Sequence, residues 1–477
     1  MAGAESEIRI RFHGEGAGTG ELTWGQRGIW DTIERTGRTM NIGGVMALPE
    51  GTPVEEIAGV LRFAVSRHQA LRTRLRFDTR HSGTAHSPSA APRQIVSESG
   101  EIALLVVDLE DGEDPAAAAE ELRSRYEFTP FDYEHEWPVR MGVIRSGGAL
   151  THLVVQYCHL AVDGLGIEAV ARDLAHLDPA TGLATAPVGG ITPLELARSQ
   201  AGPAGRRQSD KSLRYWEKLL AGLPAQRFGE SADPQEPRFW ELLCYSSAMH
   251  LALRSISART GADGSHVLLA AYAVALARVT GRSPSVAQVI VSNRFRPGFA
   301  DAVTQVSQTG ICVIDVAQCV FDDVVARAWK GATAAYLHGY YDGAKHRELL
   351  EEIEARRGER LDLSCYVNDR RGQSAPEPGE KPPTEEDLLA ALPRTRLRWD
   401  RKLPTYDGSF FLHVDSGPDT NVPGRDVPEE RELPAVYFAI WADTHRLAPA
   451  EIEACARELE AVTIEAAFDA KAPTRVE

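Results

Sequence analysis

The sequence predicts a mixed α/β protein, of the α+β type, that folds as two lobes. The chain has 477 residues, which is long for a single hydrophobic core and typical of two domains. Stretches with helical spacing and stretches with strand-like alternation follow one another without a regular β-α-β repeat. Residues 178–211, which are rich in Gly, Pro, Ala and Ser, separate two blocks of such stretches. We therefore expect an N-terminal lobe at 1–180, a linker at 181–204 and a C-terminal lobe at 205–477.

The first block contains a helix and a β-hairpin. Residues 54–68 carry apolar side chains at helical spacing, and the following RHQALRTRLRF ends in strand-like alternation. The runs 138–145 and 151–158 alternate as strands do and are joined by Ser-Gly-Gly, which predicts a hairpin. In the second run, alternation places Tyr157 on one face and Cys158 on the other. A turn follows, and then a helix from about 167 to 177.

The elements expected elsewhere rest on composition and spacing. The glycine-rich run GEGAGTG at 14–20 lacks the spacing of a phosphate-binding loop, and we interpret it as a flexible segment. We expect a short helix near 193–200, a buried helix at 266–281, a buried strand at 286–293, an amphipathic helix at 321–340, and long loops at 370–395 and 415–431.

Composition excludes several classes of protein. The net charge of −16 argues against a nucleic-acid binder, which usually presents a basic face. No apolar run approaches the length of a membrane-spanning helix, and MAGAESEIRI does not resemble a signal peptide, so we expect a cytoplasmic protein. The six cysteines are far apart and form no C-x-x-C pair, which predicts neither a metal site nor a disulfide framework. Cys312 and Cys319 are expected to be buried in a strand.

The stretch CHLAVDGLG at 158–166 is the candidate active site. It places His159 at the end of the buried strand and Asp163-Gly164 in the next turn. A neutral imidazole can accept a proton from an attacking amine or hydroxyl, or hold that nucleophile by a hydrogen bond. Asp163 is placed to brace the loop by pairing with an arginine, and Gly164 permits a backbone conformation that other residues resist. A histidine at a strand end is also common in proteins without catalytic function, so the motif needs further support.

That support comes from a resemblance to a known family. LTWGQRGIW (22–30), RHQALRTRL (67–75), PFDYEHEWPVRMGVIR (130–145), CHLAVDG and YWEKLL (215–220) occur in the order typical of condensation domains of nonribosomal peptide synthetases. SNRFRPG and QTGICVIDV fall where that family has its Gly-Arg and G-x-F-x-N-T elements. The chain therefore resembles a free-standing condensation domain of the chloramphenicol-acetyltransferase-like superfamily. The resemblance implies two acyltransferase-like lobes that form a V with a tunnel between them.

The resemblance also implies roles for single residues. His159 matches the histidine that positions or deprotonates the acceptor, Asp163 matches a structural aspartate, and Gly164 matches a glycine near the acyl carbonyl. We expect Arg67 or Arg294 to pair with Asp163. Cys158 stands in place of the first motif histidine and is expected to be structural, with a nucleophilic role less favoured. His413 and Tyr157 are weaker candidates for substrate binding, because a core histidine and a packing tyrosine are the favoured explanations.

The resemblance predicts an acyltransferase of natural-product biosynthesis. It would transfer an acyl or aminoacyl group from the phosphopantetheine thioester of a carrier protein to an amine, or to a hydroxyl, without an acyl-enzyme intermediate. The protein itself would bind no cofactor or metal and would be a monomer that acts in trans. Two alternatives remain: a non-catalytic scaffold that binds a carrier protein or a partner enzyme, and an ester-forming acyltransferase that uses coenzyme A.

Overall fold

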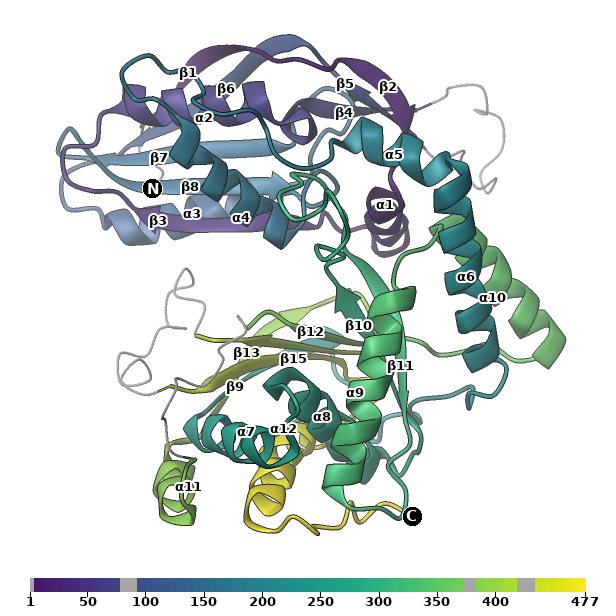
Figure 1. Ribbon diagram of the computed structural model, residues 1–477. Helices are drawn as coiled ribbons and strands as arrows, with labels where there is room; N and C mark the ends of the chain where they lie inside the picture. The colour runs from purple at the N-terminus through teal and green to yellow at the C-terminus, as the bar shows by residue number, and fades with distance from the viewer. Residues whose placement is uncertain (1–3, 78–91, 372–381, 418–433) are drawn as a thin grey trace. The chain divides into compact units, whose positions relative to one another are not determined.

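The computed structural model describes residues 4–77, 92–371, 382–417 and 434–477 (Figure 1). Within these residues, the chain divides into two compact units. The first comprises residues up to Gln208 together with Ser292–Gln308, and the second comprises Ser209–Val291 and most residues from Thr309 onward. Ser292–Gln308 belongs to the predicted C-terminal lobe but packs in the first unit. This segment contributes residues to the candidate site described below.

The first unit is built on a five-stranded mixed sheet. Its strand order is β1 (Ala4–His13), β6 (Ser99–Asp108), β7 (Val139–Ser146), β8 (Ala149–Cys158) and β3 (Asn41–Ala47). Neighbouring strands are antiparallel except for β6 and β7, which are parallel. The apolar sides of α2 (Val54–Arg67) and α4 (Gly164–Asp173) pack on one face, and α3 (Pro115–Phe128) packs on the other.

A smaller antiparallel sheet completes this unit. It contains β2 (Gly18–Glu21), β5 (Arg93–Val96) and β4 (Thr73–Arg76) in that order, with α5 (Pro193–Ala201) against β2. The glycine-rich run at 14–20 was wrongly predicted to be flexible. Gly18–Glu21 forms β2, Gly16 has a φ of 83°, and the Cα atoms of Gly14 and Gly16 lie so close to Ser66 and Gln69 that a Cβ atom would clash.

The second unit is built on a seven-stranded mixed sheet. Its order is β11 (Gln308–Ile314), β10 (Ser285–Val291), β12 (Cys365–Asp369), β14 (Phe410–Asp415), β15 (Val436–Asp443), β9 (Phe239–Ser246) and β13 (Arg396–Leu403). β10, β12 and β14 are parallel, whereas β14, β15, β9 and β13 are antiparallel. The mixed α/β class predicted from the sequence is confirmed by these two mixed sheets.

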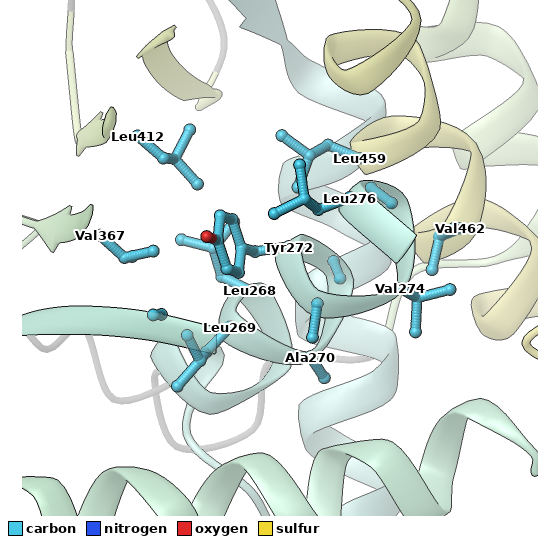
Figure 2. Packing of buried hydrophobic residues seen from close by; sticks show 14 of the residues in the cluster. Leu268, Leu269, Ala270, Tyr272, Val274, Leu276, Val367, Leu412, Leu459 and Val462 are labelled. Atoms are coloured by element: carbon cyan, nitrogen blue, oxygen red, sulfur yellow. The ribbon is translucent and has the colours of Figure 1, made fainter. Parts of the chain in front are cut away.

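Helices pack on one face of the second sheet and at one of its ends. α7 (Ser247–Thr260), α8 (Gly264–Thr280), α9 (Phe321–His338) and α12 (Pro449–Phe468) form the main core with one face. α6 (Pro203–Leu220) and α10 (Gly343–Arg357) pack at the β10–β11 end through Trp216 and Ile353. Figure 2 shows Leu268, Tyr272 and Leu276 of α8 among side chains of the sheet and of α12. The helix predicted at 266–281 is therefore confirmed as the most buried helix of its unit, because Val267–Ala277 are all buried.

Several local predictions are confirmed. The hairpin of β7 and β8 turns at Gly147 and Gly148, whose φ values of 57° and 82° suit a tight turn that only glycine adopts easily. The remaining confirmed elements are the helices at 54–67, 193–201 and 321–338 and the strand at 285–291.

Other predictions need correction. The helix expected from 167 begins three residues earlier, at Gly164, and ends at Asp173. The expected loop 370–395 contains α11 (Glu385–Ala391), which is capped by Thr384. Its residues 372–381, and residues 418–431 of the second expected loop, lie outside the described part of the chain. Cys312 is buried in β11 as expected, but Cys319 lies beyond that strand and is only half-buried.

Two observations concern disulfide bonds and membrane-spanning helices. All six cysteines are described and each is a free thiol. Among the helices in the described ranges, none is both long enough and apolar enough to cross a membrane.

Candidate active site

His159 directly follows the last residue of β8. Its backbone N–H donates to the carbonyl of Met40, 3.0 Å away, and its ring Nδ1 lies 3.0 Å from the carbonyl oxygen of Val162. Because a carbonyl oxygen only accepts hydrogen bonds, Nδ1 carries the proton of the neutral ring and Nε2 keeps its lone pair.

The charge state of His159 follows from its surroundings. Burial lowers the pKa of His159 below its usual value, although the Val162 carbonyl and the Asp163 carboxylate act in the opposite direction. The ring is therefore neutral near pH 7. A neutral imidazole with a free Nε2 is the form that can accept a proton from an amine or a hydroxyl.

Asp163 caps the helix that follows. Its Oδ1 accepts a hydrogen bond from the N–H of Gly166, 2.8 Å away, which fixes the first turn of α4. Its Oδ2 accepts from the N–H groups of Val306 (3.1 Å) and Ser307 (3.0 Å) and from the Ser307 hydroxyl (2.9 Å). The side chain is 3% exposed, so one buried carboxylate ties α4 to the segment that precedes β11.

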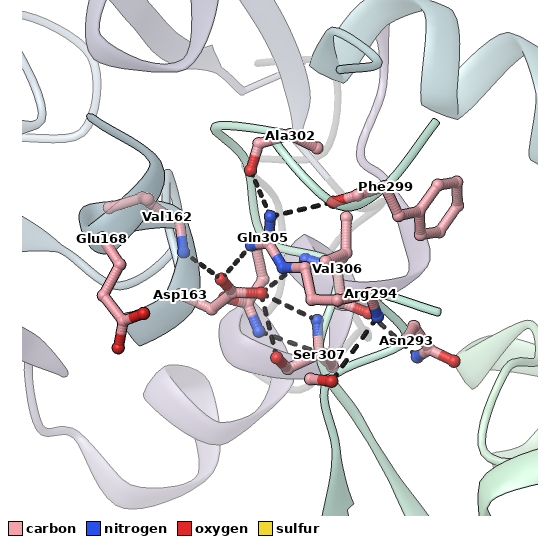
Figure 3. Close-up of polar contacts among 12 residues, drawn as sticks. Val162, Asp163, Glu168, Asn293, Arg294, Phe299, Ala302, Gln305, Val306 and Ser307 are labelled. Carbon is pink, nitrogen blue, oxygen red and sulfur yellow. Dashed lines mark hydrogen bonds and ion pairs between the residues drawn. The ribbon is translucent and has the colours of Figure 1, made fainter. Parts of the chain in front are cut away.

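Arg294 is the charged partner of Asp163. Its Nη2 donates to Asp163 Oδ1 in a buried ion pair, and its Nη1 donates to the carbonyls of Phe299 (3.0 Å) and Ala302. Figure 3 shows this guanidinium enclosed by the loop that carries it. A buried carboxylate is stable as an anion when a cation and several N–H groups satisfy its oxygens, and Asp163 meets both conditions.

Asn293 accounts for one departure from the family pattern. It precedes Arg294 where the resemblance would place a glycine, and its φ of 58° lies in the left-handed region that glycine favours. Asparagine tolerates this conformation better than most residues. Its side-chain amide donates to the carbonyl of Val306, 3.0 Å away, so it also fastens the loop that holds Asp163.

The two glycines of the motif behave differently from the expectation. Gly164 does not have a positive φ and is the first residue of α4, so the predicted backbone requirement at this position is wrong. A Cβ atom there would meet no atom within 4 Å. Gly166, which the sequence reasoning did not single out, is confined: its Cβ would lie 2.5 Å from Val162 Cγ2 and 3.2 Å from Arg294 Nη2. The fold therefore requires glycine at 166 and leaves open space beside 164.

Arg67 braces α4 at its C-terminal end. It does not pair with Asp163, so that expectation is corrected: its guanidinium makes two hydrogen bonds to Asp173 (2.6 and 2.7 Å) and one to the carbonyl of Ala186 (3.0 Å). Burial opposes ionisation of Asp173, but hydrogen bonds from Arg67 and His68 outweigh it and hold the pKa of Asp173 below its usual range. The two candidate arginines thus fix opposite ends of α4.

The first family-like stretch, 22–30, leads into the same region. Thr23 caps α1 (Trp24–Thr36), and its hydroxyl donates to the carbonyl of Gln305 (3.3 Å). A Cβ on Gly25 would lie 2.6 Å from that carbonyl oxygen, so glycine lets α1 begin against the segment that carries Val306 and Ser307.

Cys158 points into a separate apolar cluster. Its neighbours there include Trp30, Leu75 and Phe131, and burial raises the pKa of its thiol to about 12. A protonated, buried thiol is a poor nucleophile. Beside it lies a cavity of about 20 Å³, room for a single water molecule, whose lining includes Tyr133. These features suit a structural residue.

The two weaker substrate-binding candidates lie in different surroundings. Tyr157 is buried in the core of the first unit, and burial raises its pKa to about 12. His413 belongs to β14 of the second unit, where it stacks on Phe411 at 4.0 Å and its Nε2 is 3.1 Å from the Tyr406 hydroxyl. Burial, together with Arg370 and Arg401, holds the pKa of His413 well below its usual value. These surroundings suit a packing tyrosine and a core histidine.

No group of three or more His, Cys, Asp or Glu side chains in the described ranges is arranged to hold a metal ion.

Several residues that build the site were not predicted from the sequence, among them Ser307, Val306 and Asp173. Val306 and Ser307 come from a distant part of the chain, and no local pattern marks them. Asp173 lies in the predicted helix itself, but its partner Arg67 is 106 residues away in sequence.

Comparison with known proteins decides the family. A model of the condensation domain matches residues 17–356, which is well over half of the chain. The chain belongs to the condensation-domain family. The matched range includes His159, Asp163, Asn293, Arg294 and the YWEKLL segment of α6.

Curated relatives of this condensation domain are larger proteins. It is 26% identical over 300 residues to the phosphinothricin tripeptide synthetase PhsC of Streptomyces viridochromogenes, which covers 59% of this chain and 26% of the relative. It is 26% identical over 284 residues to the isonitrile lipopeptide synthase of Mycobacterium tuberculosis, covering 56% and 11% respectively. The chain thus spans about a quarter of PhsC and less of the second relative.

Solved structures share the fold of this condensation domain. SgcC5 of Streptomyces globisporus has a TM-score of 0.67 at 19% identity, covering 95% of this chain and 100% of that one. The X-domain in complex with OxyB from teicoplanin biosynthesis has a TM-score of 0.68 at 18% identity, with 96% and 95% covered. The first condensation domain of the CDA synthetase has a TM-score of 0.63 at 16% identity, with 96% and 99% covered.

The two motif glycines make a matched pair for mutation. We expect Gly166→Ala to destabilise the fold by about 1–3 kcal/mol, because its Cβ overlaps Val162 and Arg294. Gly164→Ala should leave the melting temperature within about 2 °C of wild type, because its Cβ enters open space. Thermal unfolding of both variants checks this, and equal destabilisation by the two would contradict the assigned geometry.

Removal of the buried carboxylate should weaken the whole loop. We expect Asp163→Ala to destabilise the protein by about 3–5 kcal/mol, because it leaves Arg294 buried without its acidic partner. Asp108→Ala, which removes a more exposed pair with Arg145, is the control and should change stability by less than about 1 kcal/mol. Urea unfolding measures both, and a wild-type midpoint for Asp163→Ala would rule out the bracing role.

Proposed function

We propose that this condensation domain is an acyltransferase of natural-product biosynthesis. In this proposal it transfers an acyl or aminoacyl group from a carrier-protein thioester to an amine, or to a hydroxyl, and so forms an amide or ester. The observation that carries the proposal is the position of His159: its Nδ1 faces the Val162 carbonyl, which leaves Nε2 as a proton acceptor, in a family that is typically composed of acyltransferases.

The proposed reaction needs only one proton-accepting group from the protein. The amine nitrogen or hydroxyl oxygen attacks the thioester carbonyl while its proton passes to Nε2 of His159. The carbon–sulfur bond then breaks, and the proton returns to the departing thiolate. His159 ends in its starting form, and no acyl group is attached to the protein. Cys158 has no part in the reaction, because its thiol is buried and protonated.

Asp163 and Arg294 act in this proposal by holding the loop, and Gly164 by leaving room for the substrate. Gly164 lies in the first turn of α4, and a Cβ atom there would meet no other atom, so there is space beside the loop that carries His159. The two-lobed, tunnel-forming arrangement that the family resemblance implies would deliver donor and acceptor from opposite sides. Such crevices are common sites for ligands.

We also propose that the domain works in the cytoplasm on separate carrier proteins. The phosphopantetheine arm belongs to the substrate here, and no resident cofactor is needed for the proton transfer.

Two other functions have support from particular neighbours. The X-domain, which has the same fold, was solved in complex with OxyB, and this favours the alternative of a scaffold that binds a partner enzyme. The starter condensation domain of the rhizomide synthetase was solved in complex with C8-CoA, and this favours a coenzyme A donor. Acyl transfer from matched acyl-carrier and acyl-coenzyme A donors to a panel of amines and alcohols, followed by intact mass, distinguishes all three.

Substitution of His159 tests the proposed role of its ring. We expect His159→Ala to lower acyl transfer by about 10²–10⁴-fold, the loss typical of a missing proton acceptor. His152→Ala, on the same strand β8, is the control and should retain wild-type activity. Product formation from a loaded carrier measures both. Full activity of a folded His159→Ala protein would rule out the catalytic assignment, whereas an inactive wild type with every donor would favour the scaffold.

A further inference from the structure

β1 forms one edge of the five-stranded sheet. It pairs along all ten residues with β6, without a register shift, and among the described residues no strand pairs with its other side (Figure 1). A long, regular edge strand presents a row of backbone groups on which another strand can pair, and most proteins blunt such edges.

Two other edge strands, β13 and β3, show what a blunted edge looks like. β13, at the edge of the seven-stranded sheet, has an irregularity between Trp399 and Lys402, and its charged side chains are basic except for Asp400. A bulge and a row of like charges both discourage pairing with a second copy. β3, at the opposite edge of the five-stranded sheet, contains two adjacent glycines. β1 has none of these features.

The side chains of β1 divide cleanly between its two faces. Ile8, Ile10 and Phe12 contribute to the core of the first unit. The charged side chains Glu5, Glu7, Arg9 and Arg11 lie on the other face and are 36%, 48%, 60% and 92% exposed.

The order of these charges is self-complementary. When two copies of β1 run antiparallel about Ile8, residues lie opposite each other if their numbers add up to 16. Glu5 then faces Arg11 of the second copy, and Glu7 faces Arg9. Each of the four charged positions meets an opposite charge, and Ile8 meets Ile8. Directly opposed side chains of opposite charge stabilise antiparallel strands, whereas like charges destabilise them.

We propose that β1 is a homodimerisation edge, at which two copies of this chain pair antiparallel about Ile8 and join their five-stranded sheets. Such a contact is isologous, since the same residues contribute from both copies and the two-fold axis closes the assembly. Charge complementarity selects a second copy as the occupant, because the pattern Glu-x-Glu-x-Arg-x-Arg matches itself in reverse.

Contacts within one chain do not prevent this pairing. Glu7 Oε2 lies 2.5 Å from Arg9 Nη2, and Glu5 Oε1 lies 2.6 Å from Arg125 Nη1. Arg11 Nε lies 3.8 Å from Glu101 Oε2. Ion pairs this exposed contribute little to stability, so they can exchange for contacts between copies.

The proposed dimer departs from the monomer predicted from the sequence. It also stands apart from the family assignment and from the proposed function, because the family match begins at residue 17, after β1 ends.

The oligomeric state of the full chain tests the proposal. Light scattering during gel filtration, over roughly a hundred-fold range of concentration, should show a dimer at the upper end that weakens as salt screens the charge pairs. Glu5→Arg/Glu7→Arg and Arg9→Glu/Arg11→Glu each place like charges opposite each other. Each should raise the dimer dissociation constant by about ten-fold or more.

The two double variants provide the decisive comparison. Mixed together, they should form a mixed dimer, and a protein that carries all four substitutions should dimerise as wild type does. Glu50→Arg/Glu121→Arg makes the same change of net charge at exposed positions away from β1 and should leave the dimer unchanged. Circular dichroism confirms that each variant is folded. A wild type of single-chain mass at every concentration, or folded double variants that dimerise like wild type, would overturn the proposal.

Discussion

The carboxylate of Asp163 collects hydrogen bonds from three parts of the chain. It caps α4 through Gly166, pairs with Arg294, and receives the N–H groups of Val306 and Ser307. Because the carboxylate is buried, each of these donors is needed to offset the loss of water around a charge. The candidate site depends on this interaction, since it fixes where β8 ends, where α4 begins, and how the segment before β11 lies against both.

The loop that carries His159 is a short bridge between two fixed ends. Before it, β8 is held between its neighbouring strands β7 and β3. After it, α4 is held at its start by Asp163 and at its end by the pair of Arg67 and Asp173. His159 itself is held by the Met40 and Val162 carbonyls. A proton acceptor contributes most when its position is set before the substrate arrives, and this loop provides such a position.

The parts of the fold that were predictable are those that local chemistry decides. The hairpin follows from alternation and from two glycines in a tight turn, and α8 follows from a continuous run of small apolar residues. The glycines at 14 and 16 were misinterpreted because their partners, Ser66 and Gln69, lie some fifty residues away in sequence. For the same reason the sequence could not choose between Arg67 and Arg294. Both stood in recognisable motifs, and only the packed structure shows that each pairs with a different aspartate.

The site also shows why motif residues differ in what they require. Gly166 is confined by Val162 and Arg294, whereas Gly164 is not confined by the protein at all. Asn293 shows that a family glycine can be replaced when the substitute tolerates a left-handed backbone and gains a hydrogen bond. Cys158 shows that the first motif position can be filled by a small apolar group that packs in a core.

The central claim is that this loop holds His159 neutral, with its proton on Nδ1 and its lone pair on Nε2. Nitrogen-15 NMR of the protein labelled at histidine measures the tautomer and the pKa of the ring directly. The account predicts a neutral ring protonated at Nδ1 at pH 7, which titrates only below the usual histidine pKa of about 6.5. A ring that is protonated at Nε2, or charged at pH 7, would contradict the account.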